Sequence, residues 1–323
     1  MPNLGVSAMP AERREATDVP TVSVIIATKN RTEDLADTVR DLISQTQQPN
    51  EILIVDQSST PSFDPTGFQI KIDYIFAPHL SGAAVARNVA MDHASGDIWL
   101  FLDDDVILEA DYIEQVLAAY SPEISGVSGI ITNYSVPGLT RRLFEKVFVK
   151  GAFHDDRQPI YWRADHLRFK GPQRVKQFGC GVMSFRADVI RGLRFDPRLS
   201  GCSLAEDIDF CAHLPQGAIL VIAPRARLIH KRSAVGRATA HWLDAHAQSS
   251  AYMRLRNWHR GLNDDLSFTW LQIGYGVMAA VGSLKRGSFE PFSAWQVGRA
   301  RGRSLGLQHA AQESHARVKE TIA

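Results

Sequence analysis

Three consecutive carboxylates, Asp103, Asp104 and Asp105, follow the apolar run Trp99-Leu100-Phe101-Leu102. Carboxylates this close repel one another, and burying them is costly unless a cation balances their charge. Oxygen ligands suit a hard divalent cation such as Mg²⁺ or Mn²⁺, which is often shared with a phosphate-bearing substrate. We therefore expect Asp103 and Asp105 to bind a divalent metal, whereas the three residues taken alone also fit a solvated acidic turn.

The elements around this turn alternate between β and α patterns along the first half of the chain. Short apolar runs bounded by polar residues predict strands, and apolar residues at a spacing of three or four predict helices. Such alternation with short connections predicts an α/β fold with an open, mostly parallel sheet flanked by helices. The first four strands are expected at 22–27, 52–55, 73–76 and 98–102, with helices after residue 32 and over 82–94 and 110–120.

Polar side chains follow several of these predicted strands. Asn30 and Asp56 each come just after a strand, and Arg87 lies on the helix that begins near Gly82. Because ligands bind at the carboxyl ends of parallel strands, these groups should converge with the aspartates. Asp56 suits a ribose or base, while the helix start and Arg87 suit phosphates. A nucleotide diphosphate with a metal fits this set, and no glycine-rich Rossmann or Walker fingerprint follows the first strand.

Composition limits the classes of protein that remain. The 323 residues are 45% hydrophobic and 22% charged with a net charge of +1, which is ordinary for a globular protein and gives no reason to expect nucleic-acid binding. Cys180, Cys202 and Cys211 match no zinc spacing, so we expect buried thiols in a reducing compartment. The first 20 residues lack the apolar core of a signal peptide and are expected to form a flexible tail.

The remaining chain divides into two regions. The stretch 135–174 mixes Pro, Gly, aromatic and charged residues without a period, which favours a long, partly irregular insertion. The segment 236–323 is expected to be a helical extension. Within it, 266–284 has no charged residue and is followed by Lys285-Arg286 and a basic tail. That helix could pack on the protein with a solvated basic end, or lie on an anionic inner membrane leaflet.

Four motifs in order resemble family 2 glycosyltransferases of the GT-A fold. They are VSVIIATKNR, IVDQSS, SGAAVARNVAMDHASGDIWLFLDDDV and AEDIDF, and the resemblance covers about residues 21–232. It implies a GT-A domain over 21–235 and an inverting transfer from a sugar nucleotide that depends on Mn²⁺ or Mg²⁺. It also implies a glycan or lipid-linked acceptor. The cysteines favour a cytoplasmic protein, and the 266–284 helix leaves open a peripheral contact with the inner membrane leaflet.

The resemblance also implies roles for individual residues. Asp103, Asp105 and His230 match the metal ligands, and Glu206-Asp207 matches the acidic pair whose Asp serves as the base. The expected nucleotide-sugar contacts are Thr28, Asn30, Arg31, Asp56, Gln57, Gly82, Arg87, Asn88, Asp103 and Asp104. Gln57 departs from the family, which often has a second acid there that contacts the nucleobase.

The expected chemistry agrees with these roles. Inversion at a sugar needs one displacement, with a carboxylate taking the proton of the acceptor hydroxyl, and we assign that carboxylate to Asp207. Two alternatives remain. The run Phe101 to Asp105 also fits a haloacid-dehalogenase-like phosphatase that uses Asp103 and Asp105, and the chain could be a nucleotide-sugar-binding module without turnover.

Overall fold

The computed structural model describes residues 19–134, 138–149, 170–179, 181–199, 205–231, 247–253 and 262–322. The expected tail at 1–20 lies almost wholly outside these ranges, as do Cys180, Cys202 and the predicted domain boundary at 235. Cys211 is a buried free thiol. Within the described ranges, no helix combines the length and the apolar character that crossing a bilayer requires.

The strands join in one nine-stranded sheet. Their order is β3-β2-β1-β4-β8-β6-β9-β5, and β7 also pairs with β9. The first four run parallel, as the sequence predicts, whereas β4 pairs antiparallel with β8. The strands are β1 (Val22–Thr28), β2 (Glu51–Asp56), β3 (Lys71–Phe76), β4 (Ile98–Asp103), β5 (Val106–Leu108), β6 (Ile124–Ile131), β7 (Gln173–Val175), β8 (Val182–Arg186) and β9 (Ile219–His230).

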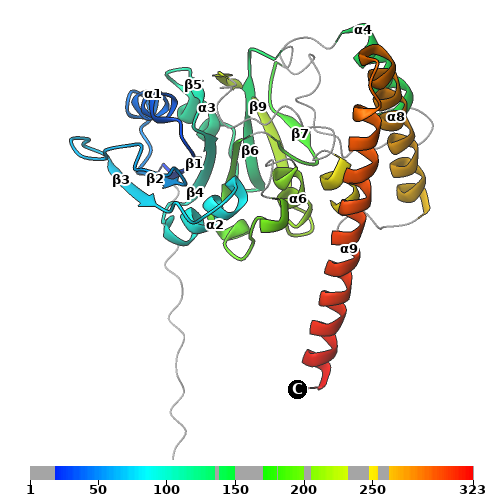
Figure 1. The fold of residues 1–323 in the computed structure, drawn as a ribbon. Coiled ribbons are helices and arrows are strands. Elements are labelled where there is room, and N and C mark those ends of the chain that lie inside the picture. The colour runs from blue at the N-terminus through cyan, green and yellow to red at the C-terminus, as the bar shows by residue number, and fades with distance from the viewer. Residues whose placement is uncertain are drawn as a thin grey trace, which may run out of the picture.

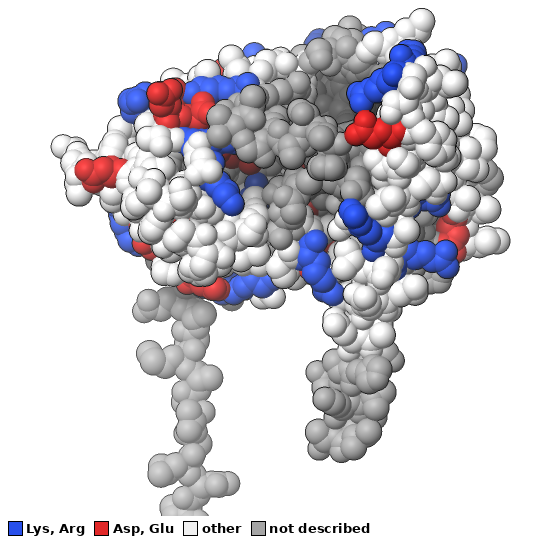
Figure 2. Space-filling model, in the orientation of Figure 1, with Lys and Arg blue, Asp and Glu red and all other residues white. Residues whose placement is uncertain are grey.

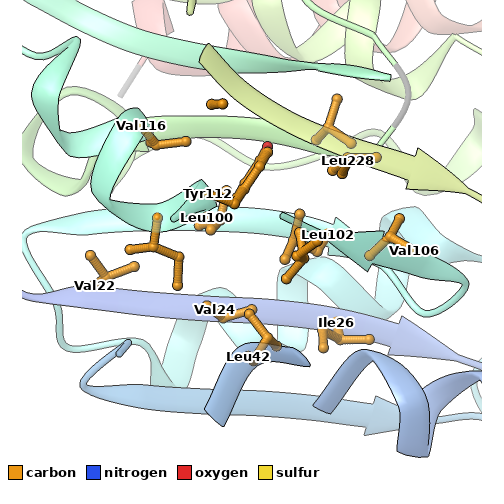
Figure 3. Packing of buried hydrophobic residues seen from close by; sticks show 14 of the residues in the cluster. Val22, Val24, Ile26, Leu42, Leu100, Leu102, Val106, Tyr112, Val116 and Leu228 are labelled. Carbon is orange, nitrogen blue, oxygen red and sulfur yellow. The ribbon is translucent and has the colours of Figure 1, made fainter. Parts of the chain in front are cut away.

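Helices cover both faces of this sheet (Figure 1). Alternating residues of β1 show why: Val22, Val24 and Ile26 pack on one side and Ile25 on the other. The first side is covered by α1 (Thr32–Ile43) and α3 (Tyr112–Ala118), and Figure 3 shows part of this core. The other side is covered by α2 (Ala83–His93), α5 (Ala187–Ile190) and α6 (Glu206–Ala212). Burying each such Val, Leu or Ile contributes about 1.5–3 kcal/mol.

The predicted, partly irregular insertion at 135–174 is described only at 138–149 and 170–174, and these parts contain short regular elements. Residues Leu139–Phe144 form α4, Glu145–Val149 form a π-helical turn, η1, and Gln173–Val175 form β7. Phe144 and Phe148 pack on Tyr275 and Trp270 of α8 (Leu262–Arg286), with ring centroids 5.4 and 5.3 Å apart. The helix therefore depends on tertiary packing that a sequence period does not reveal.

The C-terminal region is helical, in line with the sequence. Helix α8 is followed by α9 (Glu290–Ile322), and Trp295 packs against Ala279 in a small third core. Tyr252, from the helical segment 247–253, donates a buried hydrogen bond to Asp196. That bond links the C-terminal helices to the segment that follows α5.

Candidate functional site

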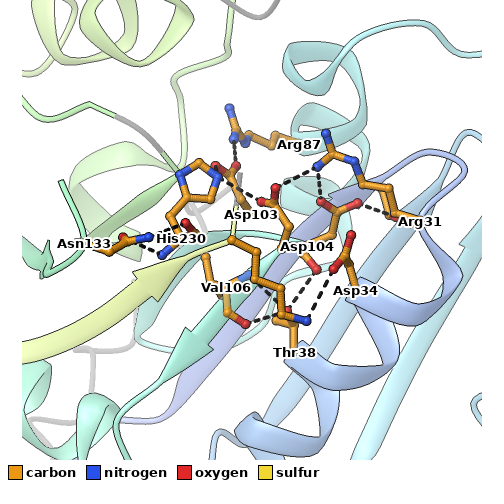
Figure 4. Close-up of polar contacts among 12 residues, drawn as sticks. Arg31, Asp34, Thr38, Arg87, Asp103, Asp104, Val106, Asn133 and His230 are labelled. Atoms are coloured by element: carbon orange, nitrogen blue, oxygen red, sulfur yellow. Dashed lines mark hydrogen bonds and ion pairs between the residues drawn. The ribbon is translucent and has the colours of Figure 1, made fainter. Parts of the chain in front are cut away.

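The aspartate turn joins the end of β4 to β5. Asp103 is partly exposed, whereas Asp104 and Asp105 are buried. Asp103 and Asp105 face His230, and one ligand atom from each of the three lies within 4.8 Å of the others (Figure 4). Two carboxylates and an imidazole at this spacing could hold a divalent cation.

The backbone around His230 explains how it reaches this turn. β9 pairs antiparallel with β5, and His230 lies opposite Val106 in that register. The Nδ2 atom of Asn133 donates to the His230 carbonyl at 2.8 Å, and the His230 N–H donates to Asn133 Oδ1 at 3.1 Å. The Asn133 amide therefore fixes the backbone that carries the ring, whose Nε2 lies 2.9 Å from Asp105 Oδ1 and 3.7 Å from Asp103 Oδ2.

Asp104 has different partners from its two neighbours. It accepts hydrogen bonds from Thr28 Oγ1 and Arg31 Nη1, each at 2.7 Å. Burial raises the pKa of Asp104 to about 6, although Arg31 and Thr28 oppose that rise. Arg31 Nη1 also lies 3.4 Å from Asp105 Oδ2. Thr28 and Arg31 thus hold the turn, and Asp104 points away from the metal-ligand set.

Thr38 of α1 supports the same turn. Its Oγ1 lies 2.9 Å from the Asp104 carbonyl and 3.0 Å from the Val106 carbonyl, and it accepts from the Val106 N–H at 3.3 Å. The buried Thr38 hydroxyl thus makes hydrogen bonds to the backbone of the turn. These bonds hold the bend between β4 and β5 in place.

Arg87 connects this turn with the acidic pair on α6. It is buried, with Nη2 3.1 Å from Asp103 Oδ1 and Nη1 2.9 Å from Glu206 Oε1. Its guanidinium also lies over the Phe195 ring, 5.6 Å from the centroid. Burial, and then the charge of Asp207, raise the pKa of Glu206 to about 7.

Asp207 is the second residue of α6, which begins directly after Ala205, whose φ is 72°. Its side chain is largely buried, and its Oδ1 accepts the Ile208 N–H at 2.7 Å. Asn88 follows Arg87 in the chain. Its Nδ2 donates to the Phe195 carbonyl at 2.8 Å, and its Oδ1 accepts the Phe195 N–H at 2.8 Å. Asn88 therefore anchors the segment around Phe195, over whose ring Arg87 lies.

Asp56, at the end of β2, is wholly buried and well satisfied. Its carboxylate accepts from the N–H groups of Ser58 and Ser62 and from the hydroxyls of Ser62 and Tyr74, at 2.6–2.9 Å. Burial would raise its pKa, but these hydrogen bonds lower it below the usual value. Asp56 thereby shapes the loop that follows β2, and Ser58 Oγ in turn accepts the Asn30 N–H at 2.7 Å.

Two further predicted residues lie near the same edge. Gln57 is 4% exposed, and its Oε1 has no hydrogen-bond partner among the residues that the structure describes. Gly82 precedes α2 with a φ of 96°, a conformation that glycine adopts readily.

Gly181 is a site residue that sequence reasoning missed. Its φ is 45°, its carbonyl accepts the Asp103 N–H at 3.0 Å, and an added Cβ would lie 2.1 Å from Asp103 Oδ1. The sequence marks Gly181 only through the motif Gly179-x-Gly181. That motif weakly resembles a dinucleotide-binding fingerprint and does not predict a contact with an aspartate. Thr38 and Asn133 carry no motif at all.

Comparison with known proteins identifies the family. Residues 23–195 match the profile of Glycosyl transferase family 2, and that match spans more than half of the chain. The chain belongs to glycosyl transferase family 2. This membership confirms the predicted resemblance and leaves no support for the phosphatase alternative.

Curated relatives match this family 2 chain over part of their length. The succinoglycan biosynthesis protein ExoM of Rhizobium meliloti is 26% identical over 225 residues, which cover 66% of this chain and 67% of ExoM. The glucosyltransferase WfgD of Escherichia coli is 32% identical over 127 residues, covering 36% of this chain and 49% of WfgD. TuaG of Bacillus subtilis is 35% identical over 103 residues, 30% of this chain and 41% of TuaG. The matches thus span between 41% and 67% of the length of these relatives.

Solved structures confirm the GT-A fold of this family 2 protein. The mannosyltransferase PcManGT of Pyrobaculum calidifontis, solved with GDP-Man and Mn²⁺, superposes with a TM-score of 0.54 at 16% identity, over 90% of this chain and 87% of that one. GalNAc-T7, solved with UDP, GalNAc and Mn²⁺, superposes with a TM-score of 0.52 at 15% identity, over 83% of this chain and 58% of that one.

Proposed function

We propose that this chain is an inverting, metal-dependent glycosyltransferase that moves a sugar from a nucleotide diphosphate sugar to a hydroxyl of a glycan or lipid-linked acceptor. The observation that carries the proposal is the grouping of Asp103, Asp105 and His230, connected through Arg87 to the Glu206-Asp207 pair. Family membership and the nucleotide and Mn²⁺ ligands of the two solved structures support it. The name of WfgD, which specifies a diphosphoundecaprenol acceptor, supports a lipid-linked acceptor.

Two carboxylates and one imidazole fit a Mn²⁺ or Mg²⁺ ion, because the set offers two oxygen ligands and one nitrogen ligand at one point. Asp103, Asp105 and His230 would hold the ion, which would offset the charge of the departing diphosphate. Asn133 would keep the His230 ring in place, and Thr38 and Arg31 would keep the aspartate turn bent.

The chain's own residues account for the remaining steps. The acceptor oxygen bonds to the anomeric carbon while the bond from that carbon to the diphosphate oxygen breaks, and the acceptor proton passes to the Asp207 carboxylate. Arg87 keeps Glu206 and Asp103 in register across the site through its two ion pairs. The loop shaped by Asp56, with Gln57 beside it, would face the nucleoside, and the start of α2 at Gly82 would face the phosphates.

The test uses the full chain with UDP-, GDP- and dTDP-sugars and MnCl₂. A true donor should raise the melting temperature of the protein only with metal present, because ligands stabilise the fold that binds them. The protein should also release nucleotide from that donor, by transfer to water where no acceptor is supplied. Asp207→Asn should keep the metal-dependent shift and release nucleotide at least about a hundredfold more slowly.

Asp188→Asn, at an exposed position of α5, is the matched control and should behave like the unaltered protein. Near-normal release by Asp207→Asn would overturn the assignment of the base. Absence of a metal-dependent shift with every donor would overturn the donor site. If the protein binds a donor but releases no nucleotide with water or with any acceptor tested, the chain is a nucleotide-sugar-binding module without turnover.

We also propose a cytoplasmic location with peripheral contact to the inner membrane leaflet. A membrane-embedded acceptor would require the enzyme to meet the bilayer.

A further inference from the structure

The outward side of α8 carries apolar side chains along most of its length. Between residues 266 and 284 no charged side chain is exposed. Five positions follow the helical spacing of three, four and seven: Leu266, Ile273, Val277, Val281 and Leu284, each 41–83% exposed. These five residues form what is called here the α8 apolar face.

The opposite side of the same helix is buried, for example at Leu271 and Ala279. Gly274 and Gly276 lie on the flanks of the exposed stripe, Gly274 against Phe148 and Phe144 and Gly276 against Trp295. Helix α8 packs on η1 and α9, and among the described residues its apolar face stays exposed. A soluble helix normally places charged residues on such a side.

The face continues onto neighbouring elements. Trp270 Nε1 donates to the Val147 carbonyl at 2.8 Å, so η1 lies beside α8. Leu143 and Val147 are 60% and 38% exposed, and Phe289, after the turn at Gly287, is 70% exposed. Over the 18 residue steps from Leu266 to Leu284, a rise of about 1.5 Å per residue gives a face about 27 Å long.

Cations border this apolar area. Arg142 and Lys146 are exposed on α4 and η1, and Lys285 and Arg286 are exposed where α8 ends. The acids on α4, η1 and α8 are Glu145, Asp264 and Asp265, and Glu290 begins α9. In Figure 2 the right-hand side of the molecule, where α8 and α9 lie, is largely white, with several blue groups and fewer red ones.

We infer that the α8 apolar face is a docking surface for an anionic phospholipid bilayer, on which α8 lies parallel to the membrane plane. Apolar side chains would enter the boundary between headgroups and acyl chains, while Lys285, Arg286, Arg142 and Lys146 would contact anionic headgroups. The inference rests on the proposed function, because a lipid-linked acceptor explains why a glycosyltransferase would need such contact.

The test is co-sedimentation of the full chain with vesicles of phosphatidylcholine and phosphatidylglycerol at three to one, compared with phosphatidylcholine alone. The protein should bind the anionic vesicles several-fold more strongly. Val277→Ser/Val281→Ser should weaken that binding at least tenfold, and Lys285→Gln/Arg286→Gln should remove the preference for anionic vesicles. Val297→Ser/Leu307→Ser, which alters exposed residues of α9, is the matched control and should bind like the unaltered protein.

Equal losses in the α8 and α9 variants, or no vesicle binding by the unaltered chain, would overturn the inference. The inference would also be overturned if light scattering showed a dimer that the α8 variant abolishes and the unaltered protein did not bind vesicles. The metal- and donor-dependent melting shift is measured on the same samples. The α8 variant should keep that shift, so a failure of membrane docking is distinguishable from a failure of the proposed function.

Discussion

His230 Nε2 lies 2.9 Å from Asp105 Oδ1, although the two residues are 125 positions apart in the chain. The contact exists because β9 returns antiparallel to β5, with His230 opposite Val106. The candidate metal site is thus completed only when the last strand has joined the sheet. A change at the end of β9 should therefore affect metal binding while the parallel strands stay intact.

His230→Ala should weaken Mn²⁺ binding by about tenfold or more, because one of three ligands is lost. Titration of Mn²⁺ by calorimetry measures the effect directly. His93→Ala removes a half-exposed histidine on α2 and should leave Mn²⁺ affinity unchanged. Unchanged affinity in His230→Ala would remove this residue from the ligand set.

Gly181→Ala should disturb the site, because the new Cβ would meet Asp103 Oδ1 at 2.1 Å and the φ of 45° disfavours a side chain. We expect a loss of stability of about 1–3 kcal/mol in urea unfolding, together with weaker Mn²⁺ binding. Gly192→Ala is the control, since a Cβ there meets no atom within 4 Å. Equal stability of the two variants would show that Asp103 can move aside at no cost.

Much of the fold could be predicted because local patterns and burial agree. β2 is buried at every residue, and its short apolar run is the signal of a strand covered on both faces. The same apolar runs predict where β2 and β4 end, and so place Asp56 and Asp103 at the ends of these strands. These residues meet because parallel strands share one carboxyl edge.

The parts that the sequence did not predict depend on contacts between distant segments. Gly181 matters because β8 runs beside β4, and Asn133 matters because its amide meets the backbone of β9. Thr38 looks like an ordinary member of a helix until the turn at Asp104 packs against it. Helix α4 escaped notice because aromatic packing on α8, rather than a regular apolar period, holds it.

Arg87→Met should destabilise the protein by about 3 kcal/mol, because Glu206 would stay buried without its cationic partner. Urea unfolding followed by circular dichroism measures the loss. The double variant Arg87→Met/Glu206→Gln should recover part of it, since it removes the unpaired acid as well. Arg40→Met, at a largely exposed arginine of α1, should change stability by less than about 0.5 kcal/mol. Additive effects in the double variant would mean that Arg87 and Glu206 are not coupled.

Glu51 should make stability depend on pH. Burial alone would raise its pKa, but hydrogen bonds from Lys71, Ser23 and Ser95 lower the pKa of Glu51 to about 2 from its ordinary 4.5. A carboxyl whose pKa is lower in the folded than in the unfolded protein stabilises the fold at any pH above its unfolded pKa. For Glu51 that contribution disappears as the pH falls from about 4.5 toward 2. Glu51→Gln should therefore cost about 3 kcal/mol at pH 7, and the difference from the unaltered protein should shrink between pH 5 and pH 3. Urea unfolding at each pH checks this, with Glu33→Gln, at an exposed position of α1, as the control. A difference that stays constant over this range would assign the effect of Glu51→Gln to packing rather than to charge.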